Sequence, residues 1–148
     1  MTQAIIAHMT LIERSQTGET DSFDPIPEAK GVGVPAVSQD YNEVTHNRSP
    51  DAFREWIKSL RDGGELAIKA NYTSAGYLQQ LQDRDHTGPI FYRTTFPLAP
   101  GQSSGDVFTF TGFPNPTIDD SDEPGETVMM TITIRTTGSI GFEPGATA

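Results

Sequence analysis

Apolar and polar residues alternate along several segments of the chain, and this period of two predicts β-strands. The clearest case covers residues 127–137, where Val128, Met130, Ile132 and Ile134 fall on one side and mostly threonines on the other. Further strands are predicted over residues 4–13, 32–44, 65–72, 90–96 and 106–113, with a short last strand over 139–142. The first of these segments also fits a short helix, although its β-branched residues favour a strand.

A different spacing, typical of a helix, occurs over residues 50–60. Phe53, Trp56, Ile57 and Leu60 stand at positions i, i+3, i+4 and i+7, which lie on one helical face. The preceding Ser-Pro pair fits an N-cap and a first helical position. The sequence therefore predicts a helix here, with its aromatic face turned into the core.

A second helix is predicted after the strand at residues 65–72. Thr73 or Ser74 can cap its start, and Tyr77, Leu78 and Leu81 share one face. A charged run and a Gly-Pro pair end the helical pattern.

Together these elements predict a mainly β fold, an antiparallel β-sandwich or half-barrel with one flanking α-helix. We expect a single domain over residues 1–148, with a long polar loop at 14–30 and a flexible tail at 143–148. The residues expected to anchor the core are Phe53, Trp56, Leu66, Ile68, Tyr72, Ile132 and Ile134.

Composition narrows what this fold can do. Hydrophobic residues make up 34% of the chain, which predicts a thin core or one that is completed at a subunit interface. The net charge of −10 opposes a protein that grips phosphate backbones, and it suits one that lets nucleic acid pass. The chain has no cysteine, no signal-peptide pattern and no apolar run of membrane-spanning length. We therefore expect a protein made in a cytoplasm, without a membrane anchor.

No residue pattern predicts catalysis, a cofactor or a metal site. His8, His46 and His86 are not spaced as metal ligands, and no phosphate-binding glycine loop or nucleophile elbow occurs. The acidic segment 119–126 carries carboxylates of the kind that bind Ca²⁺, but it lacks the order of an EF-hand loop. A solvated turn is the favoured interpretation, and we predict no catalytic, cofactor-binding or metal-ligating residues.

Basic residues gather around the central segment. Arg54, Lys58, Arg61 and Lys69 stand close together in a chain that is otherwise acidic. They fit either a solvated surface or a patch that binds an acidic neighbouring copy, and the sequence leaves both interpretations open.

Several motifs follow one another in a fixed order: FREWIKSLRDGGELAIKANY, then IFYRTTFPL, DVFTFTGF and TITIRTTGSIGF. This ordered set, from about residue 34 to residue 142, resembles the major tail tube proteins of long-tailed, siphovirus-like phages. Because many relatives carry a Pro-Gly turn near Lys58 and Ser59, residues 50–60 can also form an irregular loop. The resemblance implies a β-sandwich with a flanking helix, a fold shared with the inner tubes of contractile tails and type VI secretion.

The resemblance also implies a structural role. Hexameric rings would stack into a tube in the virion, assembled in the host cytoplasm, and strands of all subunits would join into one barrel around a lumen. The acidic composition of the chain predicts that this lumen carries net negative potential. Double-stranded DNA would pass without specific binding, and the further partners would be the tape measure protein and the tail terminator. The candidate subunit or ring contacts are Lys58, Arg61, Asp62, Gly63 and Gly64.

Two other function classes compete with this one. A β-sandwich that binds a protein or a carbohydrate would use exposed aromatic side chains such as Phe91 and Phe113 as anchors. A small enzyme is disfavoured, because no base, nucleophile and orienting residue stand together in the sequence.

Overall fold

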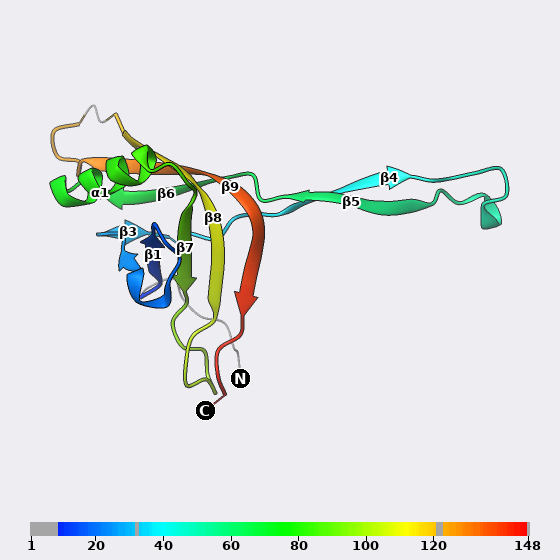
Figure 1. Ribbon diagram of the computed structural model, residues 1–148, viewed down its shortest axis with the longest axis horizontal. Helices are drawn as coiled ribbons and strands as arrows, with labels where there is room; N and C mark the ends of the chain where they lie inside the picture. Colours follow the sequence, from blue (N-terminus) through cyan, green and yellow to red (C-terminus); the bar gives the residue numbers. More distant parts are fainter. Residues whose placement is uncertain (1–8, 32, 121–122, 148) are drawn as a thin grey trace.

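A seven-stranded antiparallel sheet and a separate two-stranded hairpin make up most of the structure (Figure 1). The computed structural model describes residues 9–31, 33–120 and 123–147. The sheet has the order β2-β1-β7-β8-β9-β6-β3, and β4 pairs with β5. The elements are β1 Leu11–Ser15, η1 Thr20–Ser22, β2 Asp24–Pro25, β3 Ala29–Lys30, β4 Ser38–Glu43, η2 Pro50–Ala52, β5 Trp56–Asp62, β6 Glu65–Asn71, α1 Ser74–Asp85, β7 Ile90–Thr95, β8 Val107–Ile118 and β9 Met129–Glu143.

The sheet is curled into a half-barrel, as the bend of β8 and β9 in Figure 1 shows. These two strands pair along most of their length, and their register shifts between Thr109 and Thr111. A bulge of this kind increases the local twist and bends a strand. The predicted mainly β half-barrel with one flanking helix is therefore confirmed.

The apolar core lies on the sheet face that α1 covers. Ile68 pairs with Ile132, and Ile134 lies beside the half-buried Leu66 on the same face. Tyr92 and Phe110 extend this layer as stacked rings, with centroids 5.2 Å apart. The alternation of apolar and polar residues along β6, β7 and β9 produces this single buried face.

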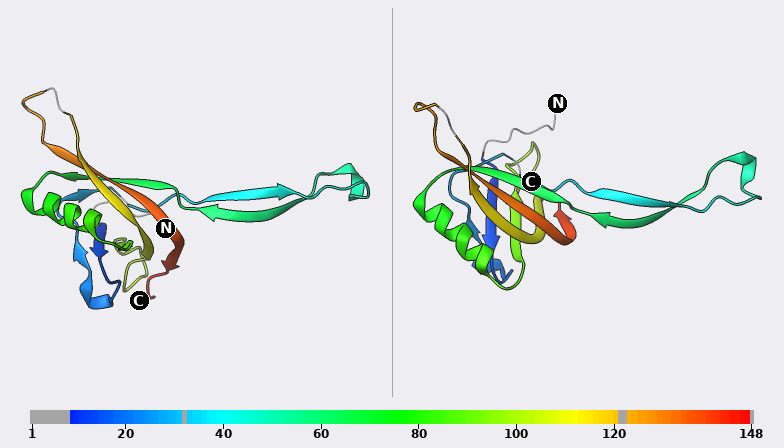
Figure 2. Two further views of the ribbon diagram at one scale, coloured as in Figure 1. Left: turned by 45° about the horizontal axis from the view of Figure 1, so that its top comes forward. Right: turned by 90° about the horizontal axis from the view of Figure 1, so that it is seen from above.

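Helix α1 lies across the half-barrel (Figure 2), and it begins where the sequence predicts. The Thr73 side chain accepts a hydrogen bond from the Gly76 amide at 3.0 Å, which satisfies one free donor of the first turn. A Cβ atom at Gly76 would lie 2.8 Å from Thr73 Oγ1 and 3.4 Å from Met130 Cε. The missing side chain therefore lets the helix approach the sheet closely.

The predicted helix over residues 50–60 is wrong. Residues 50–52 form only the short η2, and β5 follows as a strand paired with β4. The two strands form an arm, residues 38–62, that projects away from the sheet (Figure 1). Phe53 is 72% exposed and Trp56 53% exposed, so neither anchors the core. Tyr72, also expected in the core, is 41% exposed and packs on Tyr77.

The N-terminal part of the chain is more structured than the sequence predicts. The segment 14–30, expected as one long loop, contains the end of β1, η1, β2 and β3. The strand predicted over residues 32–44 begins only at Ser38, and residues 4–8 of the first predicted strand lie outside the described residues. At the other end, Gly145 and Ala146 donate hydrogen bonds to Asp106 and Ser104, so the tail is tied to the loop before β8.

β8 and β9 are longer than predicted. Gly112 and Pro114 indicate a bulge or a strand end, yet β8 continues through both to Ile118. β9 likewise continues past Gly138, which separates the strands predicted over 127–137 and 139–142, to Glu143. Gly138 has a φ of 78°, which allows the chain to deform locally without leaving the ladder.

We expect Gly112→Ala to lower the free energy of unfolding by about 1–3 kcal/mol. A Cβ atom at Gly112 would lie 2.5 Å from Ile134 Cγ2 and 2.7 Å from the Arg135 carbonyl oxygen, so two paired strands would have to shift. Urea unfolding followed by circular dichroism measures the effect. Gly125→Ala, in a turn where an added Cβ meets nothing within 4 Å, is the matched control. Equal stabilities of the two variants would contradict this account.

Candidate assembly surfaces

The arm is the first candidate surface, because it projects away from the rest of the described chain (Figure 2). β4 pairs with β5 from Ser38 opposite Asp62 to Glu43 opposite Trp56, with a bulge between Gln39 and Tyr41. An isolated two-stranded hairpin is only marginally stable in water. A hairpin that protrudes this far is therefore expected to be stabilised by contacts with another molecule.

One face of the arm carries large apolar side chains. Tyr41 lies opposite Lys58, and Trp56 stands two residues before that lysine on the same side of β5, whereas Leu60 lies in the bulge between Lys58 and Arg61. Their exposed fractions are 57% for Tyr41, 53% for Trp56 and 78% for Leu60. A hollow of about 390 Å³ borders Tyr41 and Trp56. These three side chains, called the arm stripe below, are exposed in a way that marks binding surfaces.

The tip of the arm is held in one shape by hydrogen bonds. The Ser49 hydroxyl donates to Glu55 Oε2 at 2.8 Å and accepts from the His46 amide at 2.9 Å. The Glu55 amide donates to Thr45 Oγ1 at 2.9 Å. Phe53 stands on this ordered loop and is largely exposed. A preformed tip loses little conformational entropy when it docks, which favours its use in binding.

The predicted contact residues separate into two places. Lys58 and Arg61 lie along the arm opposite Tyr41 and Gln39, with the bulge between them, and Arg61 donates to Gln39 Oε1 at 2.8 Å. Asp62, Gly63 and Gly64 lie at the arm's base. There the Thr136 amide donates to the Gly64 carbonyl oxygen at 3.0 Å, and a Cβ atom at Gly63 would meet Thr136 Oγ1 at 2.4 Å. The two glycines thus join arm and sheet by close backbone packing.

The sheet face opposite α1, called the open face below, is polar and solvent-exposed over much of its area. Its central rows run from Phe113 through Arg135 to Glu65, from Asn115 through Thr133 to Ala67, and from Thr117 through Thr131 to Lys69. Near β1 the loop around η1 covers part of it, where the Arg93 guanidinium stacks on the Phe23 ring at 4.3 Å. The two sides of the sheet therefore differ sharply, one buried under the helix and one wet.

A groove of about 490 Å³ lies on the open face beside that loop. Phe23, Phe91, Arg93, Val107 and Glu143 contribute to its walls. Phe91 is half-buried here, whereas Phe113, the other predicted aromatic anchor, is 50% exposed in the centre of the face.

One edge of the sheet is incompletely paired. β6 pairs with β9 along its whole length, but on its outer side β3 covers only Lys69 and Ala70. Within the described chain, residues 65–68 therefore have no partner strand on that side. Unpaired strand edges are templates for a strand from another chain.

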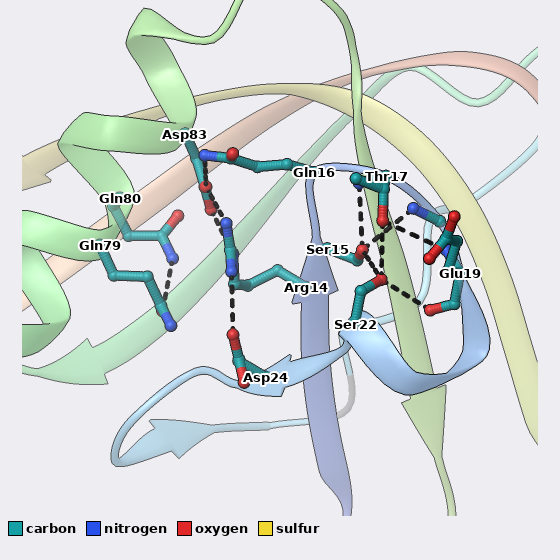
Figure 3. A network of polar contacts seen from close by, with 11 residues as sticks. Arg14, Ser15, Gln16, Thr17, Glu19, Ser22, Asp24, Gln79, Gln80 and Asp83 are labelled. Atoms are coloured by element: carbon teal, nitrogen blue, oxygen red, sulfur yellow. Dashed lines mark hydrogen bonds and ion pairs between the residues drawn. The ribbon is translucent and has the colours of Figure 1, made fainter.

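A buried ion pair joins α1 to the sheet, and the sequence gives no sign of it (Figure 3). Arg14 Nε donates to Asp83 Oδ2 at 2.6 Å, and its Nη2 donates to Asp83 Oδ1. Gln16 donates to the same carboxylate at 3.3 Å. Burial, and after it the negative charge of Asp83, raise the pKa of the Tyr92 hydroxyl far above its ordinary value. Tyr92 therefore stays protonated and neutral at any physiological pH.

No group of three or more His, Asp or Glu side chains among the described residues is placed to hold a metal ion. Asp119 of the acidic segment instead accepts hydrogen bonds from Thr131 at 2.7 Å and from Lys69 at 3.5 Å. The same part of the chain contains no helix long and apolar enough to cross a membrane.

Comparison with known proteins fixes the fold. No protein-family model matches the sequence, and no curated protein matches it either. A chain from the six-fold symmetrised baseplate of the anti-feeding prophage has a TM-score of 0.71 at 13% identity, covering 97% of this chain and 98% of that one. A chain from the same prophage's tube-terminating cap scores 0.69 at 11% identity, covering 98% and 94%. The chain has the fold of these tail components.

A third similar structure is the tail of an empty GTA particle refined with C6 symmetry. Its TM-score is 0.60 at 16% identity, and the match covers 95% of this chain and 99% of that one. All three matches extend over nearly the full length of both chains, so the arm and the half-barrel are compared together. At these identities the likeness establishes the fold, and function has to be argued from the surfaces.

Proposed function

We propose that the protein is a structural component of a phage-like tail that assembles as hexameric rings stacked into a tube. The observation that carries the proposal is the arm, which presents an exposed apolar stripe and an ordered tip to another molecule. The neighbours of the same fold come from a baseplate, a tube cap and a tail, and two of those structures have six-fold symmetry. A head-to-tail contact that closes makes a ring.

In the assembled tube, the arm of one subunit packs on the body of a neighbouring copy, and the open edge of β6 is completed by a neighbouring strand. The thin core of the single chain supports this arrangement, because apolar area is left for interfaces. Lys58, Arg61, Asp62, Gly63 and Gly64 lie on the arm or at its base, where such contacts would form. The tape measure protein and the tail terminator would bind the assembled tube in the virion.

The open face is proposed to line the bore through which double-stranded DNA leaves the capsid. Threonine and asparagine side chains in its central rows give it a wettable surface. With a net charge of −10 on each chain, the bore is expected to carry negative potential. A reconstruction that places α1 toward the lumen, or a bore of clearly positive potential, would contradict this orientation.

The test is direct imaging. Purified protein, concentrated in steps and viewed by negative-stain microscopy, is expected to show six-fold rings or stacked tubes. Size-exclusion chromatography on the same samples gives the mass of the smallest assembly. A chain that stays monomeric at every concentration, and also when it is produced together with the other tail proteins, would overturn the proposal.

A binding module is the second candidate, and the groove beside η1 is the observation that favours it. Its aromatic and apolar walls, formed by Phe23, Phe91 and Val107, suit a short protein segment or a sugar. A monomer whose melting temperature rises with a glycan or peptide, and whose Phe91→Ala variant loses that rise, would favour this function over assembly.

A further inference from the structure

Positively charged side chains on the open face form ion pairs with carboxylates. Four cationic residues lie on that face by strand register: Lys30, Lys69, Arg93 and Arg135. Three of them form ion pairs. Arg93 Nε lies 3.0 Å from Glu13 Oε1, Arg135 Nη2 lies 3.2 Å from an Asp62 oxygen, and Lys69 Nζ lies 3.5 Å from an Asp119 oxygen.

Each carboxylate is supplied by a different element from the cation it holds. Glu13 lies on β1 beside β7, where Arg93 is its register partner. Asp62 ends the arm strand β5, and Asp119 follows the last residue of β8. The pairs are therefore distributed across the whole face, from the β1 side through the base of the arm to the end of the β8–β9 hairpin.

Second contacts fix the pairs in place. Asp62 Oδ1 accepts from the Gly64 amide at 2.9 Å, and Asp119 Oδ1 accepts from Thr131 Oγ1 at 2.7 Å. The Gly64 hydrogen bond, and after it the charge of Arg135, hold the pKa of Asp62 below its ordinary value. Asp62 is therefore charged at every pH at which a tail would work. The electrostatic gain of an exposed ion pair is usually offset by the entropy that its two side chains lose when they become ordered. These second hydrogen bonds order the carboxylates in advance, so less entropy is lost when the pair forms.

We propose that Glu13, Asp62 and Asp119 are charge masks that keep the cations of the open face from binding the phosphates of nucleic acid. This inference rests on the proposed orientation of the face toward DNA. An unpaired Lys or Arg releases counterions when it contacts a phosphate, and that release drives non-specific binding. A cation that is already paired with a fixed carboxylate gains much less binding free energy from a phosphate contact. A polyanion can therefore slide past the face.

The test removes the mask without removing its hydrogen bonds. In the double variant Asp62→Asn and Asp119→Asn, each new amide oxygen can still accept from Gly64 or Thr131, but the negative charge is gone. Asp40→Asn with Asp51→Asn is the matched control, since it changes the net charge equally on the arm, away from the open face. Binding of a 30-base-pair DNA duplex is measured by fluorescence anisotropy between about 20 and 200 mM salt.

We expect the mask variant to bind at least about tenfold more tightly than the control at low salt. Its plot of log affinity against log salt should be steeper by about 1.8, since each freed phosphate contact adds about 0.9. Adding Lys69→Gln and Arg135→Gln to the mask variant should abolish the gain. Equal binding by the mask and control variants, or a gain that survives the loss of both cations, would overturn the inference.

The assay also separates this inference from the proposed function. Duplex binding is read on soluble protein whether or not rings form, and ring formation is scored by microscopy on the same variants. Wild-type protein that assembles while the mask variant gains no DNA binding would reject the masks and leave the tube intact. A wild-type chain that never assembles would reject the tube, whatever the binding data show.

Discussion

Asp83→Ala is expected to lower the free energy of unfolding by about 3–5 kcal/mol, the usual cost of removing one partner from a buried ion pair. Asp83 is only 1% exposed, and its carboxylate accepts two hydrogen bonds from Arg14. Without it, the Arg14 guanidinium would be left buried with Asp24, at 3.4 Å, as its remaining acidic partner. Many domains have a total stability of about 5–15 kcal/mol, so the loss would remove a large share.

Chemical unfolding at neutral pH measures this effect. Asp85→Ala is the matched control on the same helix, because its pair with Arg84 is at the surface and its own side chain is 74% exposed. That variant is expected to change stability by no more than about 0.5 kcal/mol. If both variants lose the same amount, then the effect comes from shortening a helical side chain and not from the buried pair.

Trp56→Ser combined with Leu60→Ser is expected to prevent ring and tube formation while leaving the melting temperature nearly unchanged. Both side chains are more than half exposed in the single chain, so folding gains little from them. At an interface, a buried aromatic or aliphatic anchor contributes about 2 kcal/mol or more. The loss of two such anchors would raise the dissociation constant of each subunit contact by about a thousandfold.

Negative-stain microscopy and sedimentation at matched protein concentrations read out the assembly. Leu78→Ser is the control, because Leu78 is 55% exposed on α1 and lies far from the arm in sequence. It should assemble as the wild type does. Rings or tubes formed by the double serine variant at wild-type concentrations would show that the arm stripe is not the contact.

Strands that bury one face could be predicted from the sequence. β6, β7 and most of β9 alternate strictly, because burial of every second residue imposes that pattern on the amino-acid choice. The start of α1 was also readable, since its cap is a local contact between Thr73 and the backbone three residues on. In each case the deciding interactions lie within a few residues or on one face of one strand.

The arm was missed for a physical reason. It has no buried face, so nothing forces its apolar residues onto one side of the strand. Trp56 and Ile57 therefore face opposite ways, Leu60 lies in the bulge that interrupts the alternation, and together with Phe53 they imitate the spacing of a helix. Local pattern alone cannot distinguish a helix with one apolar face from a hairpin that is exposed on both.

The amino-acid order by itself determined the β class, the half-barrel with a flanking helix, and the polar side of β9 that faces water. The tertiary structure alone decided that Trp56 points outward, that Arg14 meets Asp83, and that Asp62 and Asp119 reach cations of the sheet. Those contacts join residues 50 to 73 positions apart. Their formation depends on how the strands curl and pair, which no short stretch of sequence encodes.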